Sequence, residues 1–199
     1  RAFCLRKLGK TDEAATVYRE LLKASPNEPN GYATVELAEL EAAREKFEPA
    51  AVLLRSLRSD AAKQGSLPDE LREAALYRLG ICEFKLARHR EAAEVLDEFI
   101  RGFEKSPLAA SASYFCGESL FQLGAHERAC ANFARVVERF PKDAACEPSL
   151  LRLGECQAQL QRWAESEKSF AEHLDRFKTS ELGYQARFGV GWARENLGR

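Results

Sequence analysis

Apolar residues recur along this chain at the spacing of one helical face, and the whole pattern repeats. The series Leu79-Gly80, Ala92, Leu96 returns as Cys116-Gly117, Ala129, Phe133 and as Leu153-Gly154, Ser166, Phe170, and it begins again at Val190-Gly191. The step between these glycines is 37 residues each time (80, 117, 154, 191). A repeat of this length is typical of a solenoid, in which helical hairpins stack because none can bury its apolar face alone.

The clearest copy, residues 73–108, predicts two helices. Apolar residues at helical spacing around Leu79 predict the first helix, and we expect Gly80 to mark the point where the second helix crosses it closely. A turn at Ala87-Arg88 leads to a second helix whose buried face carries Ala92 and its successors. We expect Ser106-Pro107 to begin the next repeat, because Ser accepts from free backbone N–H groups and Pro suits a first turn.

The other copies align with this one. The turn falls on Gly9, Gly124 and Gly198, and the closest-packed positions of the second helices hold Ala14, Ala50, Ala92, Ala129 and Ser166. The interval between Ala50 and Ala92 is longer than the others. It predicts an extended second helix that ends at Gly65, followed by a helix with Ser66 as its N-cap and Asp69 three residues later. The connection around Gly65 is interpreted either as a tolerated loop insertion or, alternatively, as a hinge or docking loop.

The sequence therefore predicts an all-α, right-handed solenoid of about eleven helices that forms a single domain, 1–199. The repeats are expected at 1–26, 27–66, 67–107, 108–143, 144–180 and 181–199, the first and last incomplete.

Composition narrows the possible functions. Thirty basic and 31 acidic residues give a net charge of −1, so there is no basic surface of the kind that nucleic-acid binding needs. No apolar run reaches the ~20 residues that span a bilayer. Because Arg1 is not an initiator methionine and no signal-peptide pattern follows it, we expect the sequence to be an excerpt.

Six cysteines do not make a disulfide framework in a chain of 199 residues. Cys4, Cys82 and Cys156 share one repeat position and are expected to pack as small buried residues, which favours a reducing compartment. A bridge involving Cys116, Cys130 or Cys146 is the alternative.

The repeated residues resemble the tetratricopeptide repeat (TPR). Its signature is met by Tyr77, Leu79-Gly80, Phe84, Ala92, Leu96 and Pro107, and in the first copy by Ala14, Tyr18 and Pro26. Cys116 and Ser166 depart from it, and the period is longer than usual. The long period and the pairs Phe99/Phe103, Val136/Phe140 and His173/Phe177 are similar to a bacterial branch found in Tol-Pal-associated and outer-membrane-assembly proteins. That resemblance implies that the protein is located in the periplasm, whereas the cysteines favour a location in the cytoplasm.

The resemblance implies that the first helices line a concave groove. The residues that it places there as partner-binding candidates are Tyr77, Phe84, Lys85, Tyr114, Glu118, Phe121, Glu155, Phe188 and Trp192, with Glu39 at the position of Glu118 and Glu155. Such a surface suits an apolar segment that carries Lys or Arg. The alternative is that several of these aromatic side chains only pack one first helix on the next.

No feature predicts catalysis, a cofactor or a metal site. His89 and His126 occupy one repeat position, which also holds Phe47 and Trp163, so we interpret it as a packing position. His126 and Cys130 are spaced as a helical pair, but no second pair accompanies them. We therefore expect a non-enzymatic scaffold that binds a protein or peptide. The alternatives are a structural element that self-assembles through its terminal repeats and a helper domain of a bacterial envelope machine.

Overall fold

The computed structural model describes residues 1–24, 30–64 and 67–199, without the side chains of 61–64, and the described residues form eleven helices and no strand. The chain divides into two compact units, 1–103 and 104–199. The first unit holds α1 (Ala2–Lys7), α2 (Thr11–Ala24), α3 (Gly31–Ala42), α4 (Phe47–Gln64), α5 (Asp69–Lys85) and α6 (His89–Gly102). The second unit holds α7 (Ala109–Gln122), α8 (His126–Arg139), α9 (Cys146–Gln159), α10 (Trp163–Arg176) and α11 (Gly183–Asn196).

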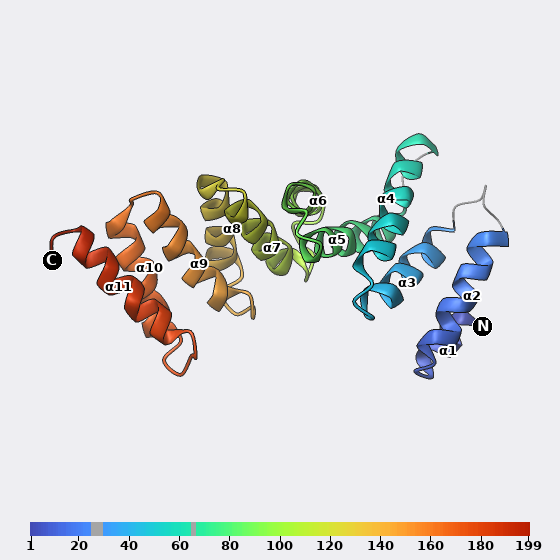
Figure 1. Ribbon diagram of the computed structural model, residues 1–199, viewed down its shortest axis with the longest axis horizontal. Helices are drawn as coiled ribbons and strands as arrows, with labels where there is room; N and C mark the ends of the chain where they lie inside the picture. Colours follow the sequence, from blue (N-terminus) through green and yellow to red (C-terminus); the bar gives the residue numbers. More distant parts are fainter. Residues whose placement is uncertain (25–29, 65–66) are drawn as a thin grey trace. The chain divides into compact units, whose positions relative to one another are not determined.

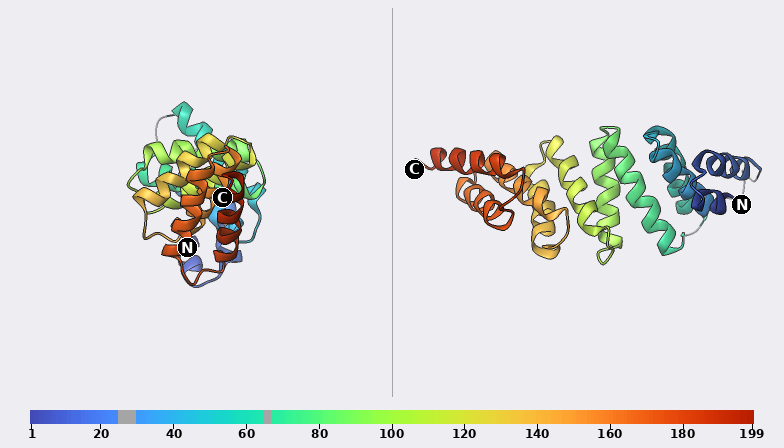
Figure 2. Two further views of the ribbon diagram at one scale, coloured as in Figure 1. Left: turned by 90° about the vertical axis from the view of Figure 1, so that its left-hand side faces the viewer. Right: turned by 90° about the horizontal axis from the view of Figure 1, so that it is seen from below.

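Within each unit every helix packs on the next one along the chain, which makes a series of helical hairpins (Figures 1 and 2). The odd-numbered helices are the first helices of the repeats, and the even-numbered ones are the second helices. First helices also touch one another directly, α3 on α5 in the first unit, and α9 on both α7 and α11 in the second. The prediction of an all-helical, TPR-like solenoid with about eleven helices is confirmed for the described residues.

The turn between the two helices of a repeat has the same backbone conformation in every copy. One residue takes a left-handed φ, between 57° and 73°, just before each second helix or at the end of the chain. These residues are Gly9, Glu45, Ala87, Gly124, Gln161 and Gly198. Glycine adopts this conformation without strain, whereas Glu45, Ala87 and Gln161 must be held in it by the helices on either side.

The closest approach of the paired helices lies where the repeated glycines predict it. The five anchor residues Ala14, Ala50, Ala92, Ala129 and Ser166 are completely buried. A Cβ atom added at Gly80 would lie 2.5 Å from Leu96, and one at Gly117 would lie 2.7 Å from Phe133. Ser166 fits as a substitute for alanine because its hydroxyl donates to the carbonyl of Gly154, 2.8 Å away. Gly191, by contrast, would meet nothing within 4 Å, since none of the described helices packs against this side of α11.

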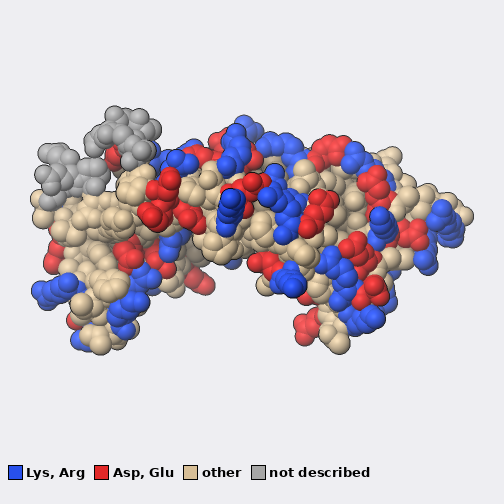
Figure 3. Space-filling model, turned by 180° about the vertical axis from the view of Figure 1, so that it is seen from behind, with Lys and Arg blue, Asp and Glu red and all other residues tan. Residues whose placement is uncertain are grey.

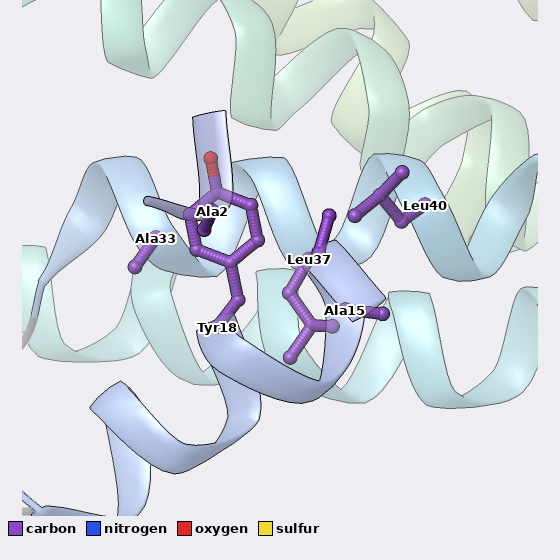
Figure 4. Packing of buried hydrophobic residues seen from close by; sticks show 7 residues of the cluster. Ala2, Ala15, Tyr18, Ala33, Leu37 and Leu40 are labelled. Carbon is purple, nitrogen blue, oxygen red and sulfur yellow. The ribbon is translucent and has the colours of Figure 1, made fainter. Parts of the chain in front are cut away.

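Apolar side chains fill the space between three helices at the start of the first unit. Tyr18 of α2 points toward Ala2 of α1 and Ala33 of α3, and Leu37 lies beside Ala15 (Figure 4). All five are buried, which shows how a repeat buries its apolar face against the next repeat.

Some local predictions are wrong. Helix α5 begins at Asp69 with Pro68 as its N-cap, later than the predicted start. The extended second helix is confirmed as α4, whereas Gly65, Ser66 and Pro26 lie outside the described residues. Ser106 does accept a hydrogen bond, from the backbone N–H of Leu108 at 3.0 Å, but Pro107 lies in the turn before α7 rather than in its first turn.

Cys82 and Cys156 are buried as predicted, but Cys4 is exposed. The prediction fails for Cys4 because, among the described helices, none of a preceding repeat covers α1. No disulfide bridge is present among the described residues.

Candidate binding surface

The first helices α7, α9 and α11 of the second unit form a continuous surface, the first-helix face, because α9 packs on both of its neighbours. Tyr114 and Phe121 of α7 lie on it half-buried. The Tyr114 ring packs against Phe115 and Phe133, with ring centroids 5.2 and 6.0 Å apart. Phe121 packs edge-on against His126 at 5.1 Å. These ring contacts are made with α7 and α8 of the same repeat, and each side chain leaves only part of its ring for a ligand.

An arginine of α9 dominates the charge on this face. Arg152 of α9 places its Nε atom 2.7 Å from one carboxylate oxygen of Glu118, and its Nη2 atom donates to the other at 2.8 Å. Its Nη1 atom donates to Glu155 at 2.7 Å, and its guanidinium lies 5.2 Å from the centre of the Phe121 ring. Glu118 and Glu155 are thus held by the protein's own cation.

The ionisation of this network follows from the same contacts. Burial raises the pKa of the Glu118 carboxyl, while the hydrogen bonds from Arg152 lower it. Burial also lowers the pKa of the Arg152 guanidinium, but the two carboxylates more than offset this, so that its pKa lies above the ordinary value. Glu118, which the resemblance places in the groove, is buried and paired with Arg152, so little of its carboxylate is open to a ligand.

Exposed aromatic side chains are concentrated on α11. Phe188 is 74% exposed and Trp192 38% exposed. Tyr184, one helical turn before Phe188, is 64% exposed and was missed. Its spacing of four residues from Phe188 is the signal that could have found it. Trp192 also packs edge-on against Trp163 at 5.2 Å, which fixes one side of its ring.

In the first unit the corresponding surface is more polar. Tyr77 packs against Phe99 at 5.7 Å and Phe84 against His89 at 5.9 Å, whereas Lys85 is exposed. Tyr32, which is 62% exposed, borders a cleft of about 190 Å³ between α3 and α5 and was also missed.

Glu39 of this unit is paired, like its counterparts in the second unit. It lies 3.1 Å from Nη2 of Arg6 and 2.9 Å from Nη2 of Arg78. Every carboxylate predicted to line the groove therefore has a guanidinium partner in the chain itself.

Each second helix except α2 begins with the residue that the sequence assigned to packing. His89 and His126 start α6 and α8, and Phe47 and Trp163 start α4 and α10. Both histidine rings lie edge-on to an aromatic ring of the preceding helix, which confirms the packing role. Among the described residues no cluster of three or more His, Cys, Asp or Glu could hold a metal ion. None of the described helices combines the length and apolar character needed to cross a bilayer.

Buried ion pairs between consecutive repeats are a feature that the sequence did not predict. Glu83 of α5 is 1% exposed, and its carboxylate lies 2.8 Å from Nε of Arg55 on α4. Glu41 of α3 is 4% exposed and pairs in the same way with Arg19 of α2. Over the part of the surface visible in Figure 3, charges of both signs alternate without a large field of one sign.

Two segments match models of the tetratricopeptide repeat, residues 77–144 and residues 1–28. No curated protein matches the chain. Among solved structures the fold is similar to YrrB, a TPR protein with an unusual peptide-binding site, at 19% identity and a TM-score of 0.74 over 94% of this chain and 88% of that one. It is also similar to the MamA protein, at 20% identity and a TM-score of 0.71 over 89% of this chain and 88% of that one. A tetratricopeptide repeat protein from Parabacteroides merdae matches at 16% identity and a TM-score of 0.70, over 99% of this chain and 71% of that one. Residues 1–28 and 77–144 are therefore similar to tetratricopeptide repeats, and the fold of the chain is similar to that of solved TPR proteins. None of these matches points to the bacterial envelope branch.

Proposed function

We propose that this TPR chain is a non-catalytic scaffold whose first-helix face, in the second unit, binds an apolar segment of a partner protein. The observation that carries the proposal is the exposure of Tyr184, Phe188 and Trp192 at successive turns of α11. Large aromatic side chains are buried when a helical array packs on itself, and exposed aromatic clusters are typical of protein-binding surfaces. YrrB, which shares the fold, is described as having a peptide-binding site, and this supports a peptide-like ligand.

The charges on the face favour an apolar ligand over a strongly charged one. Glu118 and Glu155 contribute two negative charges and Arg152 one positive charge, a net charge of −1 for the three groups. Because this arginine already pairs with both carboxylates, a basic residue of the ligand would add only a weak attraction. Affinity is therefore expected to come from the burial of the aromatic rings.

The test selects peptides from a random library on the intact chain and measures their affinity for two variants. Phe188→Ser removes the most exposed aromatic ring of α11, and Val52→Ser, a matched control, removes an apolar residue that is 52% exposed on α4. We expect Phe188→Ser to weaken binding by about 2 kcal/mol, or roughly thirtyfold, and Val52→Ser to have no effect. Circular dichroism would check that both variants keep their helices. Equal affinity of every selected peptide for both variants would contradict the proposal.

Self-association is a second candidate, favoured by exposed apolar residues on α1 and at its C-cap. Phe3 is 59% exposed and Leu8 is 72% exposed. If these side chains and Phe188 contact another copy, the molar mass measured by light scattering will rise with concentration above the 22.3 kDa of one chain. A mass that stays at one chain over the whole concentration range rules this candidate out.

A further inference from the structure

A cleft opens on the second-helix side of the second unit, between α8 and α10 and above α9. Its volume is about 390 Å³. The apolar part of its lining comes from Ala134 and Val137 of α8 and from Leu150 and Leu153 of α9. Gln157 of α9 lies in the same lining. The cleft is separate from the first-helix face, so a ligand could bind in it whether or not that face binds a partner.

In the first unit the equivalent place is filled by an arginine of the chain itself. Arg19 and Arg55 each lie five residues after the anchor alanines Ala14 and Ala50. Each guanidinium reaches a buried glutamate on the first helix of the next repeat, Arg19 to Glu41 and Arg55 to Glu83. The methylene stem of such an arginine covers the helix surface, and its head forms the ion pair.

In the second unit this arginine is absent. Ala134 lies five residues after the anchor Ala129, so it occupies the position of Arg19 and Arg55. Gln157 lies four residues before the left-handed turn residue Gln161, as Glu83 does before Ala87, so it occupies the position of the buried glutamates. Both residues line the cleft. The cleft therefore occupies the space that an arginine side chain fills in the other unit.

The polar groups around the cleft suit a guanidinium. Glu138 and Glu165 line it, both exposed, and neither forms an ion pair with a described residue. The third carboxylate, Glu172, accepts a hydrogen bond from Arg176 at 2.9 Å. Arg176 is held elsewhere as well, by the Sγ atom of Cys146 at 3.1 Å and by the carbonyl of Pro141.

Two further groups complete the lining. Gln157 accepts from the hydroxyl of Ser169 at 2.7 Å, which fixes its amide in place. Lys168 is exposed at the rim, so three carboxylates face two cations across the cleft. This net negative charge favours a cationic ligand.

We propose that this cleft binds an arginine side chain from a segment of a partner protein. The stem of that arginine lies on the apolar lining where Ala134 leaves space. Its planar guanidinium donates to Glu138 or Glu165, since this fork of donors matches a carboxylate. The occupant is an arginine rather than a lysine because the equivalent space in both first-unit copies is filled by arginine.

The test titrates the intact chain with three short peptides that are identical except for one central residue. That residue is arginine, lysine or citrulline, the neutral isostere of arginine, and binding is followed by NMR of ¹⁵N-labelled chain up to about 10 mM peptide. An ion pair with an exposed carboxylate contributes up to about 1 kcal/mol, so we expect the arginine peptide to bind up to about fivefold more tightly than the citrulline peptide. The shifted amides are expected to include Ala134 and Gln157. Free arginine at the same concentration is expected to bind more weakly than the peptide.

Two variants test whether the cleft is the site. Ala134→Arg restores the side chain present in the first unit, and we expect it to fill the cleft and abolish the binding of the arginine peptide. Ala171→Arg is the matched control, because it adds the same side chain at the same repeat position of α10, which does not line the cleft. This control is expected to leave the affinity unchanged, and circular dichroism would confirm that both variants are folded.

The proposal is overturned if the arginine peptide does not saturate the chain, if citrulline or lysine binds as tightly, or if Ala134→Arg leaves binding intact. Tighter binding of free arginine than of the peptide would overturn the assignment to a partner protein. Glu165→Gln provides a second check that does not fill the cleft. This variant is expected to bind the arginine peptide more weakly and the citrulline peptide with unchanged affinity. An equal loss of affinity for both peptides would contradict the role of the Glu165 charge.

Discussion

The same substitution at the same repeat position is expected to have opposite effects on stability in two copies. In Gly117→Ala the new methyl group would lie 2.7 Å from the ring of Phe133, which is completely buried. In Gly191→Ala the methyl group would meet nothing within 4 Å. Both glycines lie inside helices of the second unit, so both substitutions gain the same intrinsic helix propensity.

The magnitude follows from two opposing contributions. Replacing a helical glycine by alanine stabilises by about 0.8–1 kcal/mol. Inserting a methyl group into a packed core costs about 1–3 kcal/mol, because the neighbouring side chains must move away from their best positions. Gly191→Ala is therefore expected to stabilise by up to about 1 kcal/mol, and Gly117→Ala to destabilise by roughly 1–2 kcal/mol. The difference between the two variants isolates the crowding against Phe133, since the propensity cancels.

Urea denaturation followed by circular dichroism at 222 nm measures this difference, provided that the slopes of the transitions agree between the variants. Equal stabilisation by both substitutions would refute the reasoning, because it would show that Phe133 yields to a methyl group without cost. A third variant, Gly154→Ala, is expected to behave like Gly117→Ala, since its methyl group would lie 2.8 Å from Phe170.

Two further predictions concern buried polar groups. Glu83→Gln is expected to lower the free energy of unfolding by about 2 kcal/mol, because it weakens a buried pair, whereas Glu98→Gln, in the exposed pair with Arg58, should cost less than about 0.5 kcal/mol in the same urea assay. Burial lowers the pKa of His173 below 6.5, and Glu147, 3.8 Å away, opposes this only in part. As the pH is lowered below 6.5, the unfolded chain therefore takes up a proton that the folded chain does not, so the free energy of unfolding decreases as the pH is lowered. His173→Leu is expected to make this decrease smaller. An unchanged pH dependence in this variant would contradict the prediction.

The sequence was sufficient to predict features that depend on the repeat alone. The crossing at Gly80, the buried anchor at Ala129 and the turn at Gly124 recur at fixed steps, and each is determined by contacts between two consecutive helices. Phe188 is 74% exposed although Tyr114, at the same repeat position, packs on Phe133 of the paired helix, so the repeat pattern alone does not account for its exposure.

Interactions that depend on side-chain direction could not be predicted. Arg152 pairs with Glu118 across 34 positions of the chain, and nothing in the spacing of charges distinguishes this partner from the other glutamates nearby. Cys4 has the repeat position of Cys82, yet it is exposed because its burial requires a neighbouring helix rather than a particular residue at its own position. The buried pair of Arg55 with Glu83 was missed because charged residues on a helix are usually exposed to water.

Comparison of two repeats within the chain distinguishes residues that pair inside the protein from residues that are open to a ligand. A buried glutamate without its arginine would leave a carboxylate in the interior with no partner, at a cost of several kcal/mol. Where the chain has Ala134 in place of Arg55, it has the uncharged Gln157 in place of Glu83, so both members of the pair differ together. This paired difference is expected if the two residues act as one unit. It leaves no buried carboxylate at this repeat position of the second unit. The carboxylates beside the cleft, Glu138 and Glu165, are exposed, so water can solvate them.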